Sequence, residues 1–451
     1  MQLRTTTVEV SAAARTGRRR AWARALAAAL GAAALALAFA PAALGQTFKD
    51  VPKGFWARTQ IAWVTNQGTT ARKVLDDYAD GRFRPNRIIT RRQLARALVL
   101  ACGHQTDSVA EPTKLADVPA DDRDYGVIQI ALRLKLMGPF KDGFHPDSNV
   151  LAWQADRSVV RMVKVLYPDA DWTLLTALNP SNWEPNDGWK VGGPRYLAYE
   201  VATRYLNLRM NHLSDADAQE VSPAQRIGRD EVAYLVYQAL HLSTWQVGGL
   251  GNYAEVTLPK LTSRQKAIVR FAVKYIGYPY VWGGEYPTKD SPYGTQPHGG
   301  FDCSGFDWWV MKLQFGYTIG ERVAADMARA AKPHITRRKL VPGDLIFFGP
   351  KGTKSTAASI YHAALYLGNG WFIHSTGSFD GVGISSLVYD SYWKSAFAWG
   401  RRVMKAGQFT PPSVAGALGP LDVAPVAPNP AVQAMPIQVP PDADPTAPEA
   451  P

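Results

Sequence analysis

Cysteine is almost absent from this sequence, which contains two thiols, Cys102 and Cys303, among 451 residues. So small a number excludes a disulfide framework, although one bridge between the two residues remains an alternative. Cys102 follows the apolar run 98–101, which is typical of a helix end, and a buried free thiol is the ordinary state of cysteine in such a place. Cys303 lies in a less usual setting, at the start of a helical pattern.

Long apolar runs are also scarce. The one example, from Ala25 to Ala40, follows four arginines and precedes small residues that end at Gly45. This order is typical of a signal peptide, which we expect over residues 1–45 with cleavage after Gly45. A membrane anchor is the alternative, but sixteen residues are short for a bilayer span of about 20. No other segment could cross a membrane.

Acidic residues are outnumbered: 38 Asp and Glu stand against 50 Lys and Arg, and the formal net charge is +12. Removing residues 1–45 lowers it to +7. A basic exported protein favours anionic partners, such as wall polymers or lipid headgroups. Nucleic acid is not expected, because no aromatic-and-basic binding motif is present and export argues against it. The length exceeds what one core supports and predicts several domains.

A degenerate repeat occupies residues 46–245, in copies at about 46–105, 113–168 and 186–243. FKDVP at 48–52 recurs as LADVP at 115–119, and DGRFRP at 80–85 recurs as DGFHP at 142–146. Each motif precedes an apolar-periodic stretch, so each copy is predicted to be helix, turn, helix. These helices are expected at 56–64, 94–100, 125–136, 159–166 and 196–206, and residues 223–233 echo 85–95. Such pairs need one another to bury their apolar faces.

This all-α region resembles a triplet of S-layer homology modules. The resemblance implies attachment to anionic secondary cell-wall polymers. The family's binding segment, a Thr-Arg pair that opens the second helix, is present as Thr90 and Arg91. It becomes Gly228-Arg229 in the third copy, and in the second copy Ala155-Asp156-Arg157 retains the Arg alone. At the other end of the chain, residues 406–451 are rich in proline and predict a disordered tail, more in keeping with a spacer than with a docking motif.

Cys303 is expected at the first turn of a buried helix in a domain spanning residues 261–405. A first helix is predicted from Thr262 to Ile276, with Thr262 or Ser263 as its cap and Gly277 as its end. Apolar residues at helical spacing then follow Cys303, with Asp302 as the expected N-cap. The positive end of a helix favours a thiolate over a thiol. Alone, the position is better explained by a small apolar residue at a helix start, and a base within reach would reverse that preference.

Two histidines in one predicted hairpin supply a base for that thiol. Strands are expected at 344–348, 361–367 and 371–374, the last two joined by a glycine turn at 368–370. With a three-residue loop, His362 and His374 project from the same face as diagonal neighbours, about 7 to 8 Å apart between Cα atoms. A two-residue turn would place them on opposite faces.

A cysteine, a histidine base and a second polar group that orients the base form the layout of thiol peptidases. We therefore predict Cys303 as nucleophile, His362 as general base and acid, and His374 as the group that fixes the tautomer of His362. Zinc held by the same three residues is an alternative, although the ligand pairs usual in metal sites are missing. His298 or His334 could also replace one of the two histidines.

Four motifs in order resemble those of the NlpC-type cell-wall peptidases: PYVWGG at 279–284, DCSGF at 302–306, PGDLIFF at 342–348, and His362 with the turn 368–370 and His374. The resemblance implies a compact papain-like α+β fold without a cofactor. It also implies that Asp302 and Ser304 hold the N-terminal part of a peptide and that Tyr280 lines the site near the oxyanion. The loops 285–299 and 351–361 are longer than the family pattern, and Ala363-Ala364 stands where Val-Gly is common.

These features together predict an exported, wall-attached peptidoglycan hydrolase that cleaves stem peptides, most often in this family at the γ-D-glutamyl to diamino-acid bond. An amidase or acyltransferase acting on another wall amide or ester would use the same residues. A wall-binding structural protein is the non-enzymatic alternative.

Overall fold

The computed structural model describes residues 48–66, 73–178, 193–210, 220–291 and 294–412. The expected signal peptide and proline-rich tail lie outside the described residues. No helix within the described ranges is long and apolar enough to span a bilayer. Both cysteines are free, so the bridge considered above does not form.

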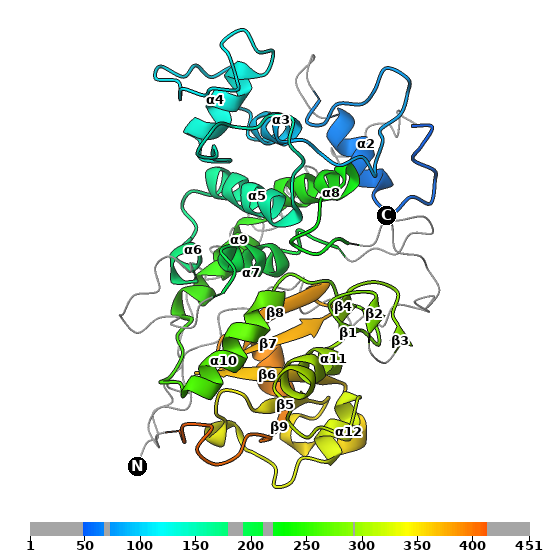
Figure 1. The fold of residues 1–451 in the computed structure, drawn as a ribbon, viewed down its shortest axis with the longest axis vertical. Helices are drawn as coiled ribbons and strands as arrows, with labels where there is room; N and C mark the ends of the chain where they lie inside the picture. Colours follow the sequence, from blue (N-terminus) through cyan, green and yellow to red (C-terminus); the bar gives the residue numbers. More distant parts are fainter. Residues whose placement is uncertain (1–47, 67–72, 179–192, 211–219, 292–293, 413–451) are drawn as a thin grey trace, which may run out of the picture. The chain divides into compact units, whose positions relative to one another are not determined.

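The N-terminal part is a module of three helix pairs, with one short helix between the second and third pairs and others after the third (Figure 1). The pairs are α2 (Arg58–Asn66) with α3 (Arg91–Ala101), α4 (Tyr125–Arg133) with α5 (Ala152–Leu166), and α7 (Leu197–Tyr205) with α8 (Arg229–Leu240). The remaining helices are α6 (Leu174–Ala177), α9 (Thr244–Gly248) and the 3-10 segment η2 (Gly249–Glu255). The module is not purely helical, because isolated antiparallel bridges link its repeats, as Thr90 to Asn149 and Leu151 to Arg226.

A closed ring of backbone hydrogen bonds joins the three repeats just before their second helices. Ile89 N–H donates to Ile227 O at 3.2 Å, Ile227 N–H to Val150 O at 3.1 Å, and Val150 N–H to Ile89 O at 3.1 Å. Each repeat therefore satisfies a neighbour's backbone groups, which would otherwise be buried unpaired. The third, blurred copy is thus a full partner in the module.

The ring also corrects our alignment of the second repeat. The first residue of each second helix donates its N–H to the loop of the next repeat: Arg91 to Ser148 O, Ala152 to Gln225 O, and Arg229 to Arg87 O. The residue equivalent to Arg91 and Arg229 is therefore Ala152, and Arg157 stands five positions further along α5. The alignment through 155–157 was wrong because α5 begins seven residues before the apolar run that we had read as its start.

The repeated Asp of the FKDVP and LADVP motifs is a clasp for the backbone. Asp50 accepts hydrogen bonds from the N–H groups of Phe83 and Arg84 at 2.9 and 2.7 Å. Asp117 accepts from Phe144 and His145 at 2.8 and 2.6 Å. Arg84 and His145 both have positive φ, 58° and 55°, a strained conformation for residues with side chains. The carboxylate holds this turn in place.

We expect Asp117→Ala to lower the free energy of unfolding by about 1–3 kcal/mol, because two backbone N–H groups lose a charged acceptor. Asp121→Ala, which removes an exposed carboxylate four residues before α4 begins, serves as the matched control. Urea denaturation measures both. Equal stability of the two variants would contradict the clasp.

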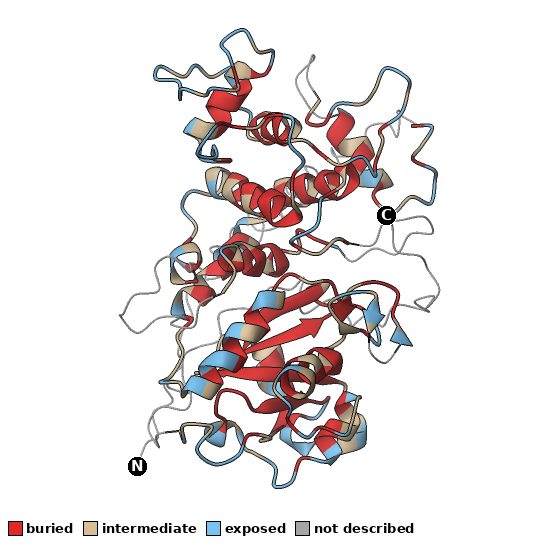
Figure 2. Cartoon of the chain, viewed as in Figure 1, coloured by how far each residue is buried: buried red, intermediate tan, exposed pale blue. Residues whose placement is uncertain are grey.

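The C-terminal part is built on a five-stranded antiparallel sheet in the order β8-β7-β6-β5-β9. Its strands are β5 (Leu345–Phe348), β6 (His362–Gly368), β7 (Trp371–Thr376), β8 (Gly381–Ser386) and β9 (Phe397–Arg401). Buried side chains fill both faces of the sheet, while α10 (Ser263–Ala272) exposes its outer side (Figure 2). The fold of this part is therefore a mixture of helix and sheet, as predicted, and β8 and β9 are strands that the sequence did not reveal.

The remaining elements are short and surround the sheet. They are η3 (Val273–Tyr275), β1 (Glu285–Tyr286), β2 (Asp290–Ser291), β3 (Gly294–Thr295), β4 (Gly300–Phe301), α11 (Cys303–Trp308), the π-helical segment η4 (Trp309–Gln314), α12 (Ala324–Arg329), η5 (Arg337–Lys339), η6 (Gly352–Lys354), η7 (Ala357–Ser359) and α13 (Ser391–Ala396). Thr262 caps α10 through Gln265 N–H, as expected. The loops 285–299 and 351–361 thus contain short elements.

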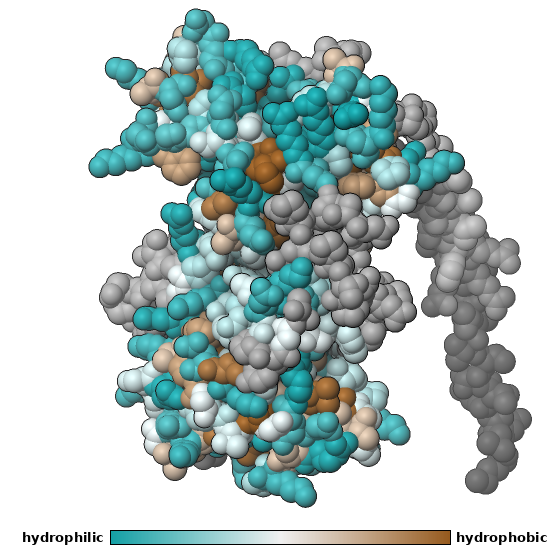
Figure 3. Space-filling model, turned by 45° about the vertical axis from the view of Figure 1, so that its right-hand side comes forward, coloured by the Kyte–Doolittle hydropathy of each residue, from teal (hydrophilic) through white to brown (hydrophobic). Residues whose placement is uncertain are grey.

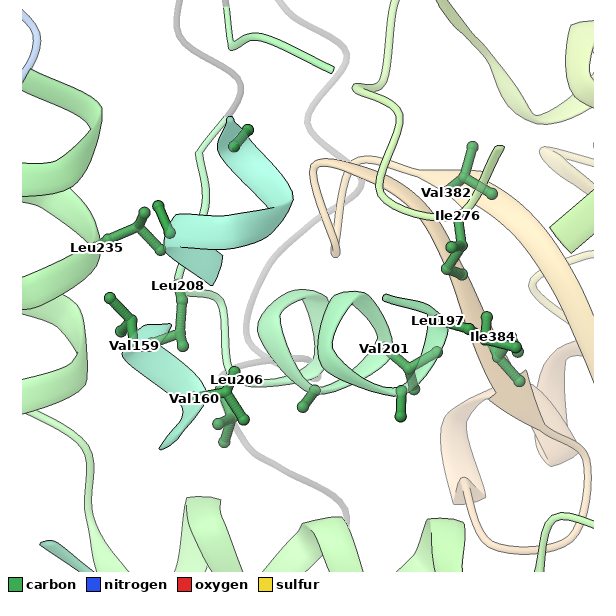
Figure 4. Packing of buried hydrophobic residues seen from close by; sticks show 14 of the residues in the cluster. Val159, Val160, Leu197, Val201, Leu206, Leu208, Leu235, Ile276, Val382 and Ile384 are labelled. Atoms are coloured by element: carbon green, nitrogen blue, oxygen red, sulfur yellow. The ribbon is translucent and has the colours of Figure 1, made fainter. Parts of the chain in front are cut away.

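Helix α7 packs against the edge of the sheet through apolar and polar contacts. Leu197 and Val201 lie beside Ile384 of β8, and Ile276 lies beside Val382 (Figure 4). Arg204, 1% exposed, pairs with Glu220 and donates to the carbonyl oxygens of Gly277, Phe379 and Asp380. A Cβ on Gly277, where φ is +81°, would lie 2.2 Å from a carboxylate oxygen of Glu200. The contact therefore requires glycine at this position.

We expect Arg204→Met to destabilise the protein by about 3–5 kcal/mol, because buried Glu220 keeps only Arg209 as a partner and the carbonyl oxygens of Gly277, Phe379 and Asp380 lose their donor. Arg209→Met is the control, since Arg209 is equally buried beside Glu220 but donates to Val221 O within the helical module. Hydrogen exchange separates the two variants. The Tyr280 amide, bound to Asp380 O at 3.0 Å, should lose more protection in Arg204→Met than in Arg209→Met, and equal loss would contradict a specific link.

Candidate active site

Cys303 is the first residue of α11, and Asp302 caps this helix as predicted. Asp302 Oδ1 accepts from Gly305 N–H at 2.6 Å, and its backbone is extended. The cap ends the chain's extended run and orients the helix start, so the Cys303 thiol is directed at the start of β6. There the backbone of Ala363, together with that of Ser304, hydrogen-bonds the thiol.

His362 begins β6, and His374 lies on β7 on the same face of the sheet. Leu365 pairs with Ile373, which places His374 opposite Ala364, the register expected from a glycine-containing turn. The ladder shifts between Tyr366 and Gly368, and Asn369 takes a positive φ of 50°. His362 Nε2 and His374 Nδ1 are consequently 2.7 Å apart.

Ser385 of β8 completes the chain of polar groups, with its Oγ 3.0 Å from His374 Nε2. Both ring nitrogens of His374 are therefore engaged, whereas His362 uses Nε2 for its contact with His374. Trp393 packs against both imidazoles, with ring centroids 4.9 Å from each. Sequence reasoning missed Ser385, because β8 carries no signal that shows which of its residues faces β7.

Burial opposes every charge in this group. Burial raises the pKa of the Cys303 thiol to about 12, with a further contribution from the charge of Asp302. It lowers the pKa of His362 to about 3 and that of His374 well below its usual range. The resting site therefore favours a neutral thiol and neutral imidazoles.

Cys303 and His362 line one cavity of about 720 Å³. Its other lining residues include Tyr280, Trp282, Glu285, Asp302, Ser304, Arg322, Val323, Ile360, Tyr361 and Thr376. Trp282 and Val323 are exposed apolar side chains, 51% each. All three residues that the resemblance assigned to the substrate, Tyr280, Asp302 and Ser304, thus border the same space. His298 and His334 do not; His334 stacks on Trp399 at 4.2 Å.

Arg322 crosses one end of the cavity and was not anticipated. Its guanidinium bonds Asp302 at 3.0 and 3.1 Å and Ser304 Oγ at 3.1 Å. Its Nε donates to Glu285 Oε2 at 2.8 Å. Asp302 is therefore shared between the helix cap and this arginine. Nothing in the sequence around Arg322 marks it, since it lies in a loop before α12 and reaches its partners only in the folded chain.

Asp307, one turn after Cys303, is fully buried and neither carboxyl oxygen has a hydrogen-bond partner in the described structure. Burial, followed by the charge of Asp302, raises its pKa well above the usual value. Among the described residues no group of three or more His, Cys, Asp or Glu side chains is placed to hold a metal ion.

We expect Asp307→Asn to gain stability relative to the parent protein as pH rises. The pKa of Asp307 in the folded protein lies above its value in the unfolded chain. Asp307 therefore does not lower the free energy of unfolding below about pH 4, and above that pH it lowers it by about 1.4 kcal/mol per pH unit until the folded-state pKa is reached. Denaturation between pH 4 and 8 measures the trend, with the exposed Asp290→Asn as control. A pH-independent difference would contradict a buried neutral carboxyl.

Residues 277–402 match the model of the NlpC/P60 family, and residues 47–95 match that of the S-layer homology domain. The chain therefore carries an NlpC/P60 domain and an N-terminal S-layer homology domain, which confirms both resemblances drawn from the motifs. The S-layer match covers the first of the three repeats and ends inside α3.

Several curated proteins share this similarity. Murein DD-endopeptidase MepH of Escherichia coli is 35% identical over 34% of this chain and 51% of its own. Gamma-DL-glutamyl hydrolase of Bacillus subtilis is 34% identical over 58% and 55%. The probable peptidoglycan endopeptidase LytE of the same species is 38% identical over 33% and 35%. The chain thus spans about half or less of the length of these relatives.

Among solved structures, an NlpC/P60 family protein from Bacillus cereus is 30% identical, with a TM-score of 0.26, over 33% of this chain and 42% of that one. The peptidoglycan hydrolase RipB from Mycobacterium tuberculosis is 28% identical, with a TM-score of 0.25, over 32% and 65%. The sequence matches, and not these superpositions, carry the family assignment.

Proposed function

We propose that this chain, which carries an NlpC/P60 domain behind an S-layer homology domain, is an exported cysteine endopeptidase of peptidoglycan. The observation that carries the proposal is the Cys303 thiol in one cavity with His362, whose remote nitrogen is 2.7 Å from His374. Relatives of the catalytic part are named as peptidoglycan endopeptidases, which supports the substrate class.

The proposed role of His362 as a base requires one particular tautomer of each histidine. For Nδ1 of His362 to accept the thiol proton, its Nε2 must carry hydrogen and donate to Nδ1 of His374. His374 then carries its hydrogen on Nε2 and donates to Ser385 Oγ. His374 in this scheme orients His362 and stabilises the imidazolium that forms, the part played by the third member of a triad.

The reaction would begin when the Cys303 sulfur attacks the scissile carbonyl carbon and its proton passes to His362. The tetrahedral oxyanion is stabilised by backbone N–H groups at the start of α11, with Tyr280 nearby. His362 returns the proton to the leaving amine as the C–N bond breaks and a thioester remains. Water, activated by His362, then hydrolyses the thioester and frees Cys303.

The bond that we propose is the γ-D-glutamyl to diamino-acid bond of the stem peptide, with Asp302 and Ser304 holding the peptide's N-terminal part. Arg322 and Glu285 border the same end of the cavity, so charged groups of the substrate meet charged partners there. The match to a γ-DL-glutamyl hydrolase over 262 residues favours γ-glutamyl amides outside the stem peptide as a second candidate substrate.

The three repeats would hold the enzyme on anionic secondary polymers of the wall, which places it at the cell surface. The helical module presents a largely hydrophilic surface, with apolar patches more evident over the peptidase part (Figure 3). Sedimentation with sacculi before and after removal of the secondary polymers tests this role. Undiminished binding to stripped sacculi would contradict it.

We expect Cys303→Ala to abolish release of fragments from peptidoglycan, because no thioester can form. Ser385→Ala should keep the nucleophile and lower kcat by roughly tenfold to a hundredfold with little change in KM, because it loosens the orientation of His374 rather than substrate binding. Ser386→Ala, the next residue on β8, is the control.

Reverse-phase separation with mass spectrometry measures the rates and identifies the cleaved bond, which separates endopeptidase from amidase. Activity that survives in Cys303→Ala would refute the mechanism, and a Ser385→Ala variant with unchanged kcat would refute the orienting chain.

A further inference from the structure

Three arginines of the helical module lie near one another beside Trp153 and Tyr199, and none of them forms an ion pair with a carboxylate of the described residues. Arg157 and Arg161 follow Trp153 by one and two turns on α5, and Arg195 precedes α7. The guanidinium carbons of Arg157 and Arg195 lie 4.9 and 4.6 Å from the centroid of the Trp153 ring. Arg161 donates from Nε to the hydroxyl of Tyr199 at 3.2 Å. The three cations therefore occupy one face formed by α5 and α7.

Holding these three positive charges near one another without a counter-charge is electrostatically unfavourable. No described carboxylate forms an ion pair with any of the three, although the neighbouring Arg204 and Arg209 are both paired. The Nε of Arg157 is buried and has no hydrogen-bond partner. Burial, followed by repulsion from Arg161, lowers the pKa of Arg157 to about 10. Arg157 and Arg161 are partly buried and Arg195 is exposed, so a ligand can reach all three side chains. Neighbouring cations repel one another unless a counter-charge lies between them, so the cluster fits a site whose counter-charge arrives with a ligand.

The arginines at the family's motif positions are less suited to that task. Arg91 donates to Phe144 O and Gly138 O at 2.7 and 2.8 Å, and Arg229 donates to Phe83 O at 3.0 Å and to Asp76 O. Both side chains are 2% exposed. They hold loops of neighbouring repeats in place, and the second repeat has Ala152 at this position.

We propose that Arg157, Arg161 and Arg195 form a binding site for an oxyanion, phosphate or carboxylate, of an anionic wall polymer. The inference rests on the proposed attachment of the chain to such polymers, and it places the binding site on α5 and the segment before α7. Arginine suits this role because its planar fork can donate two parallel hydrogen bonds to either anion. Trp153, stacked on Tyr196 with centroids 5.8 Å apart, supplies a rigid surface beneath two of the guanidinium groups.

The test compares the full chain with the variant R157Q/R161Q/R195Q and with K53Q/K114Q/K164Q, which removes three exposed lysines of the same module. Sedimentation with sacculi that retain their secondary polymers should weaken at least tenfold in the arginine variant and less than twofold in the lysine variant. Soluble poly(glycerol phosphate) and polyglucuronate then compete for the parent protein, and the stronger competitor shows whether phosphate or carboxylate is preferred.

Thermal unfolding separates a binding site from a structural role. Removing three mutually repelling cations should leave the melting temperature unchanged or raise it, while poly(glycerol phosphate) or polyglucuronate should raise that of the parent alone, since a ligand stabilises the state that binds it. Undiminished sedimentation of the arginine variant, or weaker binding together with a lower melting temperature, would overturn the site. A parent protein that does not sediment with sacculi would instead refute wall attachment itself.

Discussion

The hydrogen bond between His362 and His374 is the constraint on which the candidate active site depends, and the register of one hairpin sets it. A shift of one residue between β6 and β7 would send His374 to the opposite face, because side chains alternate along a strand. The glycine-rich turn and the ladder shift near Gly368 fix that register. With that register, Trp393 packs against both imidazoles and Ser385 contacts His374. These contacts stabilise the orientation of the two imidazoles that the turn has set.

The helical module depends on a similarly local device used three times. The ring through Ile89, Val150 and Ile227 satisfies backbone groups that no repeat could satisfy alone, so the repeats need one another for polar as well as apolar reasons. The same ring explains why sequence similarity between the copies is concentrated in the turns. Side chains in the helices need only be apolar on one face, whereas the clasps at Asp50 and Asp117 require a carboxylate at a fixed position.

The sequence therefore predicted those features of the structure that are determined by residues close together in the chain. The caps at Thr262 and Asp302, the turn of the hairpin, and the individual helices each depend on residues that are close together in the sequence. Ser385, Arg322 and Asp307 could not be found in this way, because their roles follow from strand order, from a loop that crosses the cavity, and from burial. The misalignment at Arg157 has the same origin: an apolar run shows that a helix exists but not where it begins, and the backbone ring that fixes this point joins residues far apart in the chain.

The contact between α7 and the sheet has a consequence for how attachment and catalysis relate. The carbonyl oxygen of Asp380 accepts from both Arg204 of the third repeat and the backbone N–H of Tyr280, at 3.1 and 3.0 Å. Arg204 also bonds the carbonyl of Gly277, three residues before Tyr280. The segment 277–280, which carries Tyr280 to the cavity, is thus held by Arg204 of the helical module, whose guanidinium also forms a buried ion pair with Glu220. Loss of these hydrogen bonds would leave buried carbonyl oxygens unpaired, so the helical module supports the segment that brings Tyr280 to the cavity.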